Sequence, residues 1–180
     1  MSSWSRVARR IRVPLGFVFA ALYIWLARPT WTSLFVGTAI VAAGLWLRAL
    51  ASGHVKKNEE LTTTGPYAHT RNPLYLGSIL IGVGFGIASR SPFVLIALVL
   101  LFLFIYVPVV RSEEAYLRSR FPEFEEYARA VPRFGWRVRT EGHRCGAFSR
   151  ELYRRHREYN ALLGAAAIVA VLVVKLVMTK

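Results

Sequence analysis

The sequence predicts an all-α protein, a polytopic bundle of membrane-spanning helices. Of its 180 residues 54% are hydrophobic and 19% are charged, whereas a soluble domain usually has about 45–50% apolar and about 25% charged residues. The chain nonetheless has a formal net charge of +14, from 24 Lys and Arg against 10 acids. Charged and apolar residues are segregated along the chain, and five long windows contain no charge at all. These observations exclude a soluble enzyme.

Each charge-free window has, or approaches, the length of a membrane-spanning helix, which is roughly 17–25 apolar residues. The windows are residues 13–27, 29–47, 72–89, 91–110 and 159–174. The second, third and fourth are long enough as they stand. The first and last reach this length if Arg12, Arg28 and Lys175 extend their charges to the membrane interface. The first window ends without a small-x-small cleavage site, so it is predicted to be a retained helix and not a signal peptide.

The distribution of cations predicts the orientation. With the N-terminus in the cytoplasm, 20 of the 24 cations lie on the cytoplasmic side, 12 of them between residues 111 and 160. The positive-inside rule therefore predicts five spans with the N-terminus inside and the C-terminus outside. Short links at residues 28–30 and 90–91 predict two antiparallel hairpins. We expect an integral, multi-pass protein of a bacterial inner membrane whose functional face is cytoplasmic.

Glycines are frequent in the third window, where residues 82–86 read Gly-Val-Gly-Phe-Gly. This run imitates the glycine-rich loop of soluble nucleotide-binding enzymes, but that loop lies between a strand and a helix. Inside a charge-free span every backbone N–H must be satisfied within the helix. Gly82 and Gly86 are therefore predicted to form a packing face of small residues.

A polar segment leads into the third window. A Gly-Pro pair at residues 65–66 predicts a turn, and Asn72 followed by Pro73 predicts the start of a helix. Arg71 beside a helix N-terminus suits an anionic group such as a carboxylate or a phosphate. The residues alone leave an alternative open, in which this is a loop leading into the membrane with Arg71 at the lipid headgroups.

Aromatic side chains accompany that arginine. Tyr67 and Tyr75 offer ring faces to a purine or to a sulfonium cation. The alternative assigns both tyrosines to the aromatic belt of the membrane interface.

A second polar segment follows the fourth window. Its apolar residues form a broken amphipathic stripe, which predicts a cytoplasmic helical segment along the membrane surface, divided at Pro122. The stripe consists of Leu117, Phe121, Phe124, Tyr127, Ala128 and Val131. Glu113 and Glu114 lie within one turn of the fourth window, beside Arg111, where unpartnered carboxylates are costly, so they are candidate functional residues. The alternative is a solvated face with intrahelical pairs such as Glu114–Arg118.

Read together, the two segments resemble a known pair of motifs. The first reads Gly65-Pro66-Tyr67-x-x-x-Arg71-Asn72-Pro73-x-Tyr75-x-Gly77, and the second reads Arg111-x-Glu113-Glu114-x-x-Leu117 and ends Val131-Pro132-Arg133. They resemble the signatures of the isoprenylcysteine carboxyl methyltransferase and phospholipid methyltransferase superfamily, over about residues 30–136. The resemblance implies S-adenosylmethionine as the methyl donor, bound at the cytoplasmic face, and a lipophilic or lipidated acceptor that enters from the bilayer.

The resemblance also implies roles for individual residues. Cofactor binding is expected of Tyr67, His69, Arg71, Asn72, Pro73, Tyr75, Glu114, Tyr127 and Arg133. Glu113, Glu114 and Arg111 are expected at the methyl-transfer centre. Asn72 stands where His is common in eukaryotic relatives, which removes a titratable group but keeps hydrogen-bonding capacity. No metal site is predicted, because Cys145 is the single cysteine and the four histidines are not clustered.

The chain continues beyond the second motif by about 44 residues. We expect a methyltransferase-like core in residues 1–134, and in residues 135–180 a basic juxtamembrane segment with a further span. Because the arginine-rich run directly precedes an apolar window, attraction to anionic lipid headgroups accounts for it better than nucleic-acid binding does. Nothing in the sequence indicates an oligomeric state.

The leading functional hypothesis is methylation of a lipid-embedded acceptor, with carboxylate O-methylation favoured over N-methylation. A carboxylate acceptor needs an arginine to orient it, whereas an amine must lose a proton, which Glu113 or Glu114 could accept. The alternatives are a phospholipid N-methyltransferase, a membrane NADPH-dependent reductase of similar architecture and a non-catalytic membrane scaffold.

Overall fold

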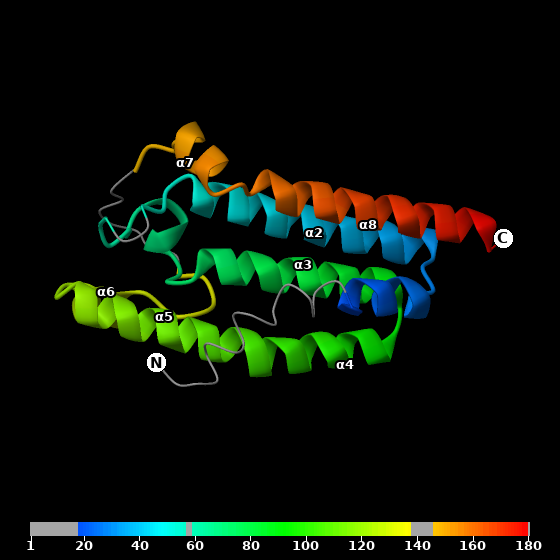
Figure 1. The fold of residues 1–180 in the computed structure, drawn as a ribbon, viewed down its shortest axis with the longest axis horizontal. Helices are drawn as coiled ribbons and strands as arrows, with labels where there is room; N and C mark the ends of the chain where they lie inside the picture. Colours follow the sequence, from blue (N-terminus) through cyan, green and yellow to red (C-terminus); the bar gives the residue numbers. More distant parts are fainter. Residues whose placement is uncertain (1–17, 57–58, 138–145, 180) are drawn as a thin grey trace.

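The computed structural model describes residues 18–56, 59–137 and 146–179, which form only helices and loops (Figure 1). The helices are α2 (Trp31–Ser52), α3 (Pro73–Ser89), α4 (Pro92–Leu101), α5 (Val107–Arg120), α6 (Phe124–Ala130), α7 (Arg150–Arg155) and α8 (Tyr159–Met178). A 3₁₀ turn at Gly65–Ala68 precedes α3, and a π turn at Phe102–Tyr106 joins α4 to α5. Residues 18–26 are also helical. The predicted all-α class is confirmed for the described residues.

Three described helices are long and apolar enough to cross a membrane. They are α2, the continuous helix Pro92–Arg120 and α8, with 22, 29 and 20 residues. Helix α3 is also apolar but has 17 residues. The first predicted span, residues 13–27, is described only from residue 18. The three long helices indicate an integral membrane protein, while the full set of five spans and the N-in/C-out orientation stay predictions.

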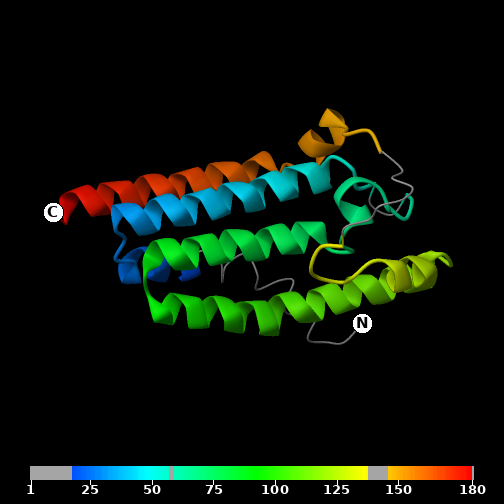
Figure 2. The same cartoon turned by 180° about the vertical axis from the view of Figure 1, so that it is seen from behind.

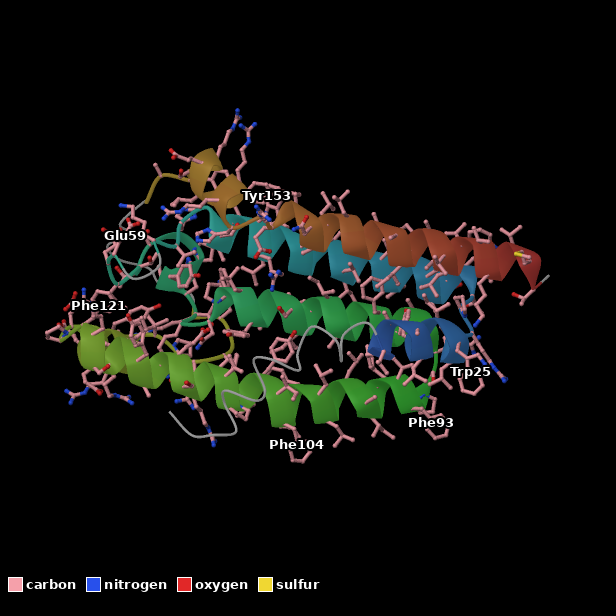
Figure 3. The ribbon with its side chains drawn as sticks, viewed as in Figure 1. Trp25, Glu59, Phe93, Phe104, Phe121 and Tyr153 are labelled. Atoms are coloured by element: carbon pink, nitrogen blue, oxygen red, sulfur yellow. The ribbon has the colours of Figure 1, made fainter. Side chains whose placement is uncertain are left out.

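The long helices run side by side, and the polar segments gather at one end of the bundle (Figures 1 and 2). The 3₁₀ turn, α6 and α7 lie at this end, and the short links before α2 and between α3 and α4 lie at the other. Outward-facing apolar side chains cover the flanks, as Figure 3 shows for Trp25, Phe93 and Phe104. The segregation of charge seen in the sequence is therefore a segregation in space.

Glycines allow α2 and α3 to approach until their backbones touch. A Cβ added at Gly37 would lie 2.5 Å from the carbonyl oxygen of Gly84, and one at Gly44 would lie 2.7 Å from that of Gly77. Such contacts are typical of membrane helices, which associate by close van der Waals packing. This pairing fixes the position of α3, whose N-terminus carries the first motif.

Gly82 and Gly86 lie on a different face of α3, toward α4. A Cβ at Gly86 would meet Leu95 of α4 at 2.4 Å, whereas one at Gly82 would make an ordinary contact with Leu98 at 3.5 Å. The predicted packing role therefore holds for Gly86, and the tightest small-residue contacts involve other glycines. Because residues 82–86 are helical, their resemblance to a nucleotide-binding loop has no structural counterpart.

Helix α4 continues into α5 through the π turn. Pro108 lacks an N–H, and its ring would crowd the carbonyl group of Phe104 in a regular α-helix, so the chain widens locally. Residues 111–120 therefore extend α4 and do not form a short helix of their own. The break predicted at Pro122 is confirmed, since α5 ends at Arg120 and α6 begins at Phe124.

The C-terminal helix packs on α2 and on the helical residues 18–26. Leu172 and Leu176 share a buried apolar cluster with Tyr23, Ala27 and Leu34. Near the far end of the bundle, Lys175 Nζ donates to the carbonyl oxygens of residues 24 and 25 at 2.6 and 3.1 Å. The predicted boundary between residues 134 and 135 stays a prediction, although residues 146–179 contact the core closely.

Candidate functional site

The first motif meets the second through the side chain of Asn72. Asn72 occupies the N-cap position of α3 and Pro73 follows at the first helical position, as predicted. Its side chain makes no capping hydrogen bond, however. Instead Nδ2 donates to Glu114 Oε1 at 2.9 Å and to the carbonyl oxygen of Arg133 at 3.2 Å. The residue that begins α3 therefore contacts the end of the fourth apolar segment.

Glu114 is the centre of the site and is 2% exposed. Its Oε2 accepts from Arg133 Nε at 2.9 Å and lies 2.7 Å from Arg133 Nη2. Arg71 Nη1 lies 3.7 Å from the same oxygen. The hydrogen bond that Arg133 donates to Glu114 raises the pKa of Arg133. Three partners compensate the buried carboxylate, which makes the ionised form favourable despite its burial. The alternative pair Glu114–Arg118 does not form, because Arg118 pairs with Glu125.

Arg133 reaches Glu114 because the chain after α6 folds back along the first motif. The backbone N–H of Arg71 donates to the carbonyl oxygen of Pro132 at 2.9 Å, and the backbone N–H of Arg137 donates to the carbonyl oxygen of His69 at 3.1 Å. The His69 ring stacks on Trp136 with 4.5 Å between ring centroids. These contacts make one unit of residues 69–72 and 131–137.

The two tyrosines predicted at the site are also linked. The phenol of Tyr127 donates to the carbonyl oxygen of Tyr67 at 2.8 Å. Burial raises the pKa of both phenols, so both remain neutral at physiological pH. This bond connects α6 to the 3₁₀ turn of the first motif.

A cavity of about 470 Å³ opens beside this unit, within the range of about 300–1,000 Å³ typical of small-molecule sites. Its lining includes eight of the predicted residues: Tyr67, Arg71, Asn72, Pro73, Tyr75, Glu113, Glu114 and Tyr127. Three predicted residues do not line it. His69 and Arg133 support the wall from outside, and Arg111 is exposed.

Arg71 lines the cavity and has one buried donor that is unsatisfied among the described residues. Its Nε is buried and has no hydrogen-bond partner among the described residues. Buried donors without a partner are rare and costly in native structures. As a cation that lines the cavity, Arg71 suits an anionic ligand group.

The two adjacent glutamates differ in their surroundings. Glu114 is buried and fully engaged, whereas Glu113 is exposed, lines the same cavity and has no ion pair with any described residue. Glu113 is therefore the acid available to a ligand, and Glu114 is the acid that organises the wall. The sequence, which placed them side by side, did not distinguish these roles.

Several lining residues were not predicted. They are Val55, Lys56, Glu60, Leu61 and Thr62 from the loop after α2, Leu74 from α3, and Tyr116, Leu117 and Phe124 from the second motif. The amphipathic stripe had included Leu117 and Phe124, but the loop after α2 has no motif that points to a site. Among the described residues, no group of three or more His, Cys, Asp or Glu side chains could hold a metal ion, and Cys145 lies outside them.

Three apolar helices and a cavity at their polar end define an integral membrane protein with room for a small-molecule ligand. Residues 15–123 match the family model described as phospholipid methyltransferase. This match spans more than half of the chain, and the chain belongs to the phospholipid methyltransferase family. The superfamily resemblance inferred from the two motifs is thereby confirmed.

Two curated relatives are similar over part of their length. The chain is 39% identical over 132 residues to the cobalt-zinc-cadmium resistance protein CzcN of Cupriavidus metallidurans, which covers 68% of this chain and 60% of the relative. It is 36% identical over 111 residues to the nickel-cobalt-cadmium resistance protein NccN of Alcaligenes xylosoxydans xylosoxydans, which covers 61% and 51%. The chain thus spans between half and two thirds of the relatives it matches. No solved structure matches it.

Proposed function

We propose that this protein is an S-adenosylmethionine-dependent methyltransferase that modifies a lipid-embedded acceptor at the cytoplasmic face of a bacterial inner membrane. Membership of the phospholipid methyltransferase family supports this activity. The observation that carries the proposal is the cavity where the two motifs meet, which is lined by the cation Arg71 and by the exposed acid Glu113. An amino-acid group, with one carboxylate and one ammonium, needs that pair of charges.

The residues present fit S-adenosylmethionine. Arg71, beside the N-terminus of α3, would hold its carboxylate, since both the guanidinium group and the helix dipole favour an anion there. Glu113 would hold the ammonium. Tyr67 and Tyr75 line the same cavity and offer aromatic faces to the purine or the sulfonium. We propose no metal cofactor, because methyl transfer from a sulfonium needs none.

When bound, S-adenosylmethionine supplies an electrophilic methyl group for in-line displacement. The chain contributes positioning and the exclusion of water. We favour a carboxylate acceptor, because its oxygen is already ionised and a second cation that lines the cavity, Lys56, could orient it. If the acceptor is instead a phospholipid amine, Glu113 would accept the proton, since Glu114 is engaged with three partners.

The names of the relatives suggest a physiological setting for the test. Both are described as resistance proteins for cobalt and cadmium, so we propose assaying membranes from cells grown with and without cobalt. Membranes containing the protein would be incubated with S-adenosylmethionine carrying an isotopically labelled methyl group, and the products would be identified by mass spectrometry.

We expect a labelled lipid or lipidated product that depends on the protein and is lost with Glu113→Gln. Glu125→Gln, which changes an exposed acid outside the cavity, serves as the matched control. Alkali removes a methyl ester but not an N-methyl group, which separates the two acceptor classes. No label in any product would contradict the proposal and favour a scaffold, and NADPH-dependent reduction in the same membranes would favour a reductase.

A further inference from the structure

An arginine in α2 connects the C-terminal helix to the start of α3. Arg48 Nε donates to Glu158 Oε2 at 3.0 Å, and Arg48 Nη2 lies 2.8 Å from both carboxylate oxygens of Glu158. Arg48 Nη1 donates in the opposite direction, to the carbonyl oxygen of Leu74 at 3.2 Å and to Ser78 Oγ at 2.6 Å. Glu158 immediately precedes α8. One guanidinium group therefore binds both α8 and the first turns of α3.

Arg48 crosses α3 at a glycine of the first motif. A Cβ added at Gly77 would lie 2.6 Å from Arg48 Cγ, so only glycine leaves room for the arginine stem. Leu74, which accepts the hydrogen bond, lies between Pro73 and Tyr75, and all three line the cavity. The position of Arg48 is thus coupled to the first turn of α3, which forms one wall of the cavity.

Electrostatics require a partner for Arg48. The N-terminus of a helix carries a partial positive charge, so a cation held there by Leu74 is unfavourable unless an anion compensates it. The side chains of Arg48 and Glu158 are 22% and 13% exposed, so solvent compensates them only in part. Without Glu158, the guanidinium group would lose the partner that orients it toward Leu74.

The residues just before α8 also hold the end of α2. The Ser149 N–H donates to the carbonyl oxygen of Gly53 at 2.9 Å, and His156 Nδ1 lies 3.1 Å from that of Ser52. The ring of Phe148 packs directly on Gly53. Two residues after Gly53 comes Val55, the first of the lining residues at positions 55–56 and 60–62. The segment 146–158 therefore contacts the end of α2 and, through Arg48, the first turns of α3, and lining residues of the cavity adjoin both.

We propose that Glu158 is a positioning residue of the cavity, acting through Arg48 on the first turn of α3, so that the C-terminal segment is a working part of the site. This segment lies beyond residues 15–123, which match the family. The claim depends on the proposed function only for the identity of the ligand.

The test compares Glu158→Ala with Glu151→Ala in the full-length protein in lipid nanodiscs. Glu151 is an exposed acid in α7 of the same segment and does not line the cavity. Hydrogen exchange would be followed at residues 76–78, whose amides close the first turns of α3, and S-adenosylmethionine binding would be measured by calorimetry. For Glu158→Ala we expect about tenfold faster exchange at residues 76–78 and unchanged exchange at residues 80–89. We also expect the Kd for S-adenosylmethionine to rise about tenfold, the typical effect of losing a contact that supports a site. Glu151→Ala should change neither, and Glu158→Asp should recover part of both.

Each outcome decides the claim. Unchanged exchange at residues 76–78, or equally faster exchange throughout α3, would overturn it, because the pair would then have no local effect. Faster local exchange with an unchanged Kd would also overturn it, since the pair would support the helix but not the site. If the unaltered protein binds no S-adenosylmethionine, the proposed function fails and the exchange measurement alone decides the positioning claim.

Discussion

The side-chain amide of Asn72 donates a 2.9 Å hydrogen bond to the buried carboxylate of Glu114 and so joins the start of α3 to α5. The two residues are separated by a helical hairpin, and each belongs to a different motif. The same carboxylate accepts from Arg133, which belongs to the chain after α6. Glu114 therefore organises three separate segments around the cavity.

Replacing Glu114 should weaken both fold and site. Glu114→Gln leaves Arg71 and Arg133 without their counter-ion and is expected to lower the free energy of unfolding by about 1–3 kcal/mol. Thermal unfolding in detergent measures the loss. Glu125→Gln is the matched control, because Glu125 and its partner Arg118 are more than half exposed, and such pairs contribute about 0–1 kcal/mol. Equal melting temperatures for the two variants would show that Glu114 does not organise the site.

Replacing Glu113 should weaken ligand binding but leave the stability of the fold unchanged. This side chain is exposed and has no ion pair within the described part of the chain, so Glu113→Gln is expected to leave the melting temperature unchanged. If the carboxylate holds the ammonium of the cofactor, the Kd for S-adenosylmethionine should rise about tenfold or more, the effect of one charge-assisted hydrogen bond. Calorimetry on the variant measures this. Wild-type affinity would remove Glu113 from the site.

The glycine contacts between α2 and α3 give a prediction about packing. A methyl group at Gly84 would lie 2.6 Å from the carbonyl oxygen of Gly37 and 2.8 Å from Val41. Gly84→Ala must therefore separate the helices and is expected to cost about 1–3 kcal/mol. Gly164→Ala in α8 meets nothing within 4 Å and should be neutral or slightly stabilising. Thermal unfolding compares the two, and an equally stable Gly84→Ala protein would contradict the close approach.

The buried tyrosines predict a loss of stability in alkali. Burial raises the pKa of Tyr67 and Tyr127 above the usual value of about 10. Above pH 10 the unfolded chain therefore loses protons that the folded chain retains, and stability falls by about 1.4 kcal/mol per pH unit for each such tyrosine. Denaturation measured between pH 8 and 11 should show this fall, with a shallower slope for Tyr127→Phe. Identical slopes would indicate that Tyr127 is not protected by burial.

Much of this site could be predicted from local sequence. Asn72-Pro73 marked the start of α3, and Pro122 marked the break before α6, because proline restricts the backbone wherever it occurs. The two motifs supplied most of the polar residues of the cavity. The resemblance implied that the two motifs form one site. They come together because the hairpin of α3 and α4 returns the chain to the same end of the bundle.

Other features depended on the tertiary structure. The side-chain oxygen of Asn72 could cap its own helix by accepting from a backbone N–H, but no such bond forms. Instead the amide is held by the hydrogen bond that its Nδ2 donates to the buried carboxylate of Glu114. In the sequence, Arg48 is one of 24 cations, and Glu158 directly follows an arginine-rich run. Their pairing across 110 positions leaves no local pattern, so only the packing of α8 on α2 reveals it.

The most direct test of the account is a calorimetric titration of the purified protein with S-adenosylmethionine and, separately, with NADPH. We predict that S-adenosylmethionine binds with one site per chain, that NADPH does not bind, and that Arg71→Ala weakens the binding about tenfold or more while the protein stays folded. Arg129→Ala, which removes an exposed arginine outside the cavity, should bind as the unaltered protein does. Binding of NADPH alone, or S-adenosylmethionine affinity that is the same with and without Arg71, would contradict the account.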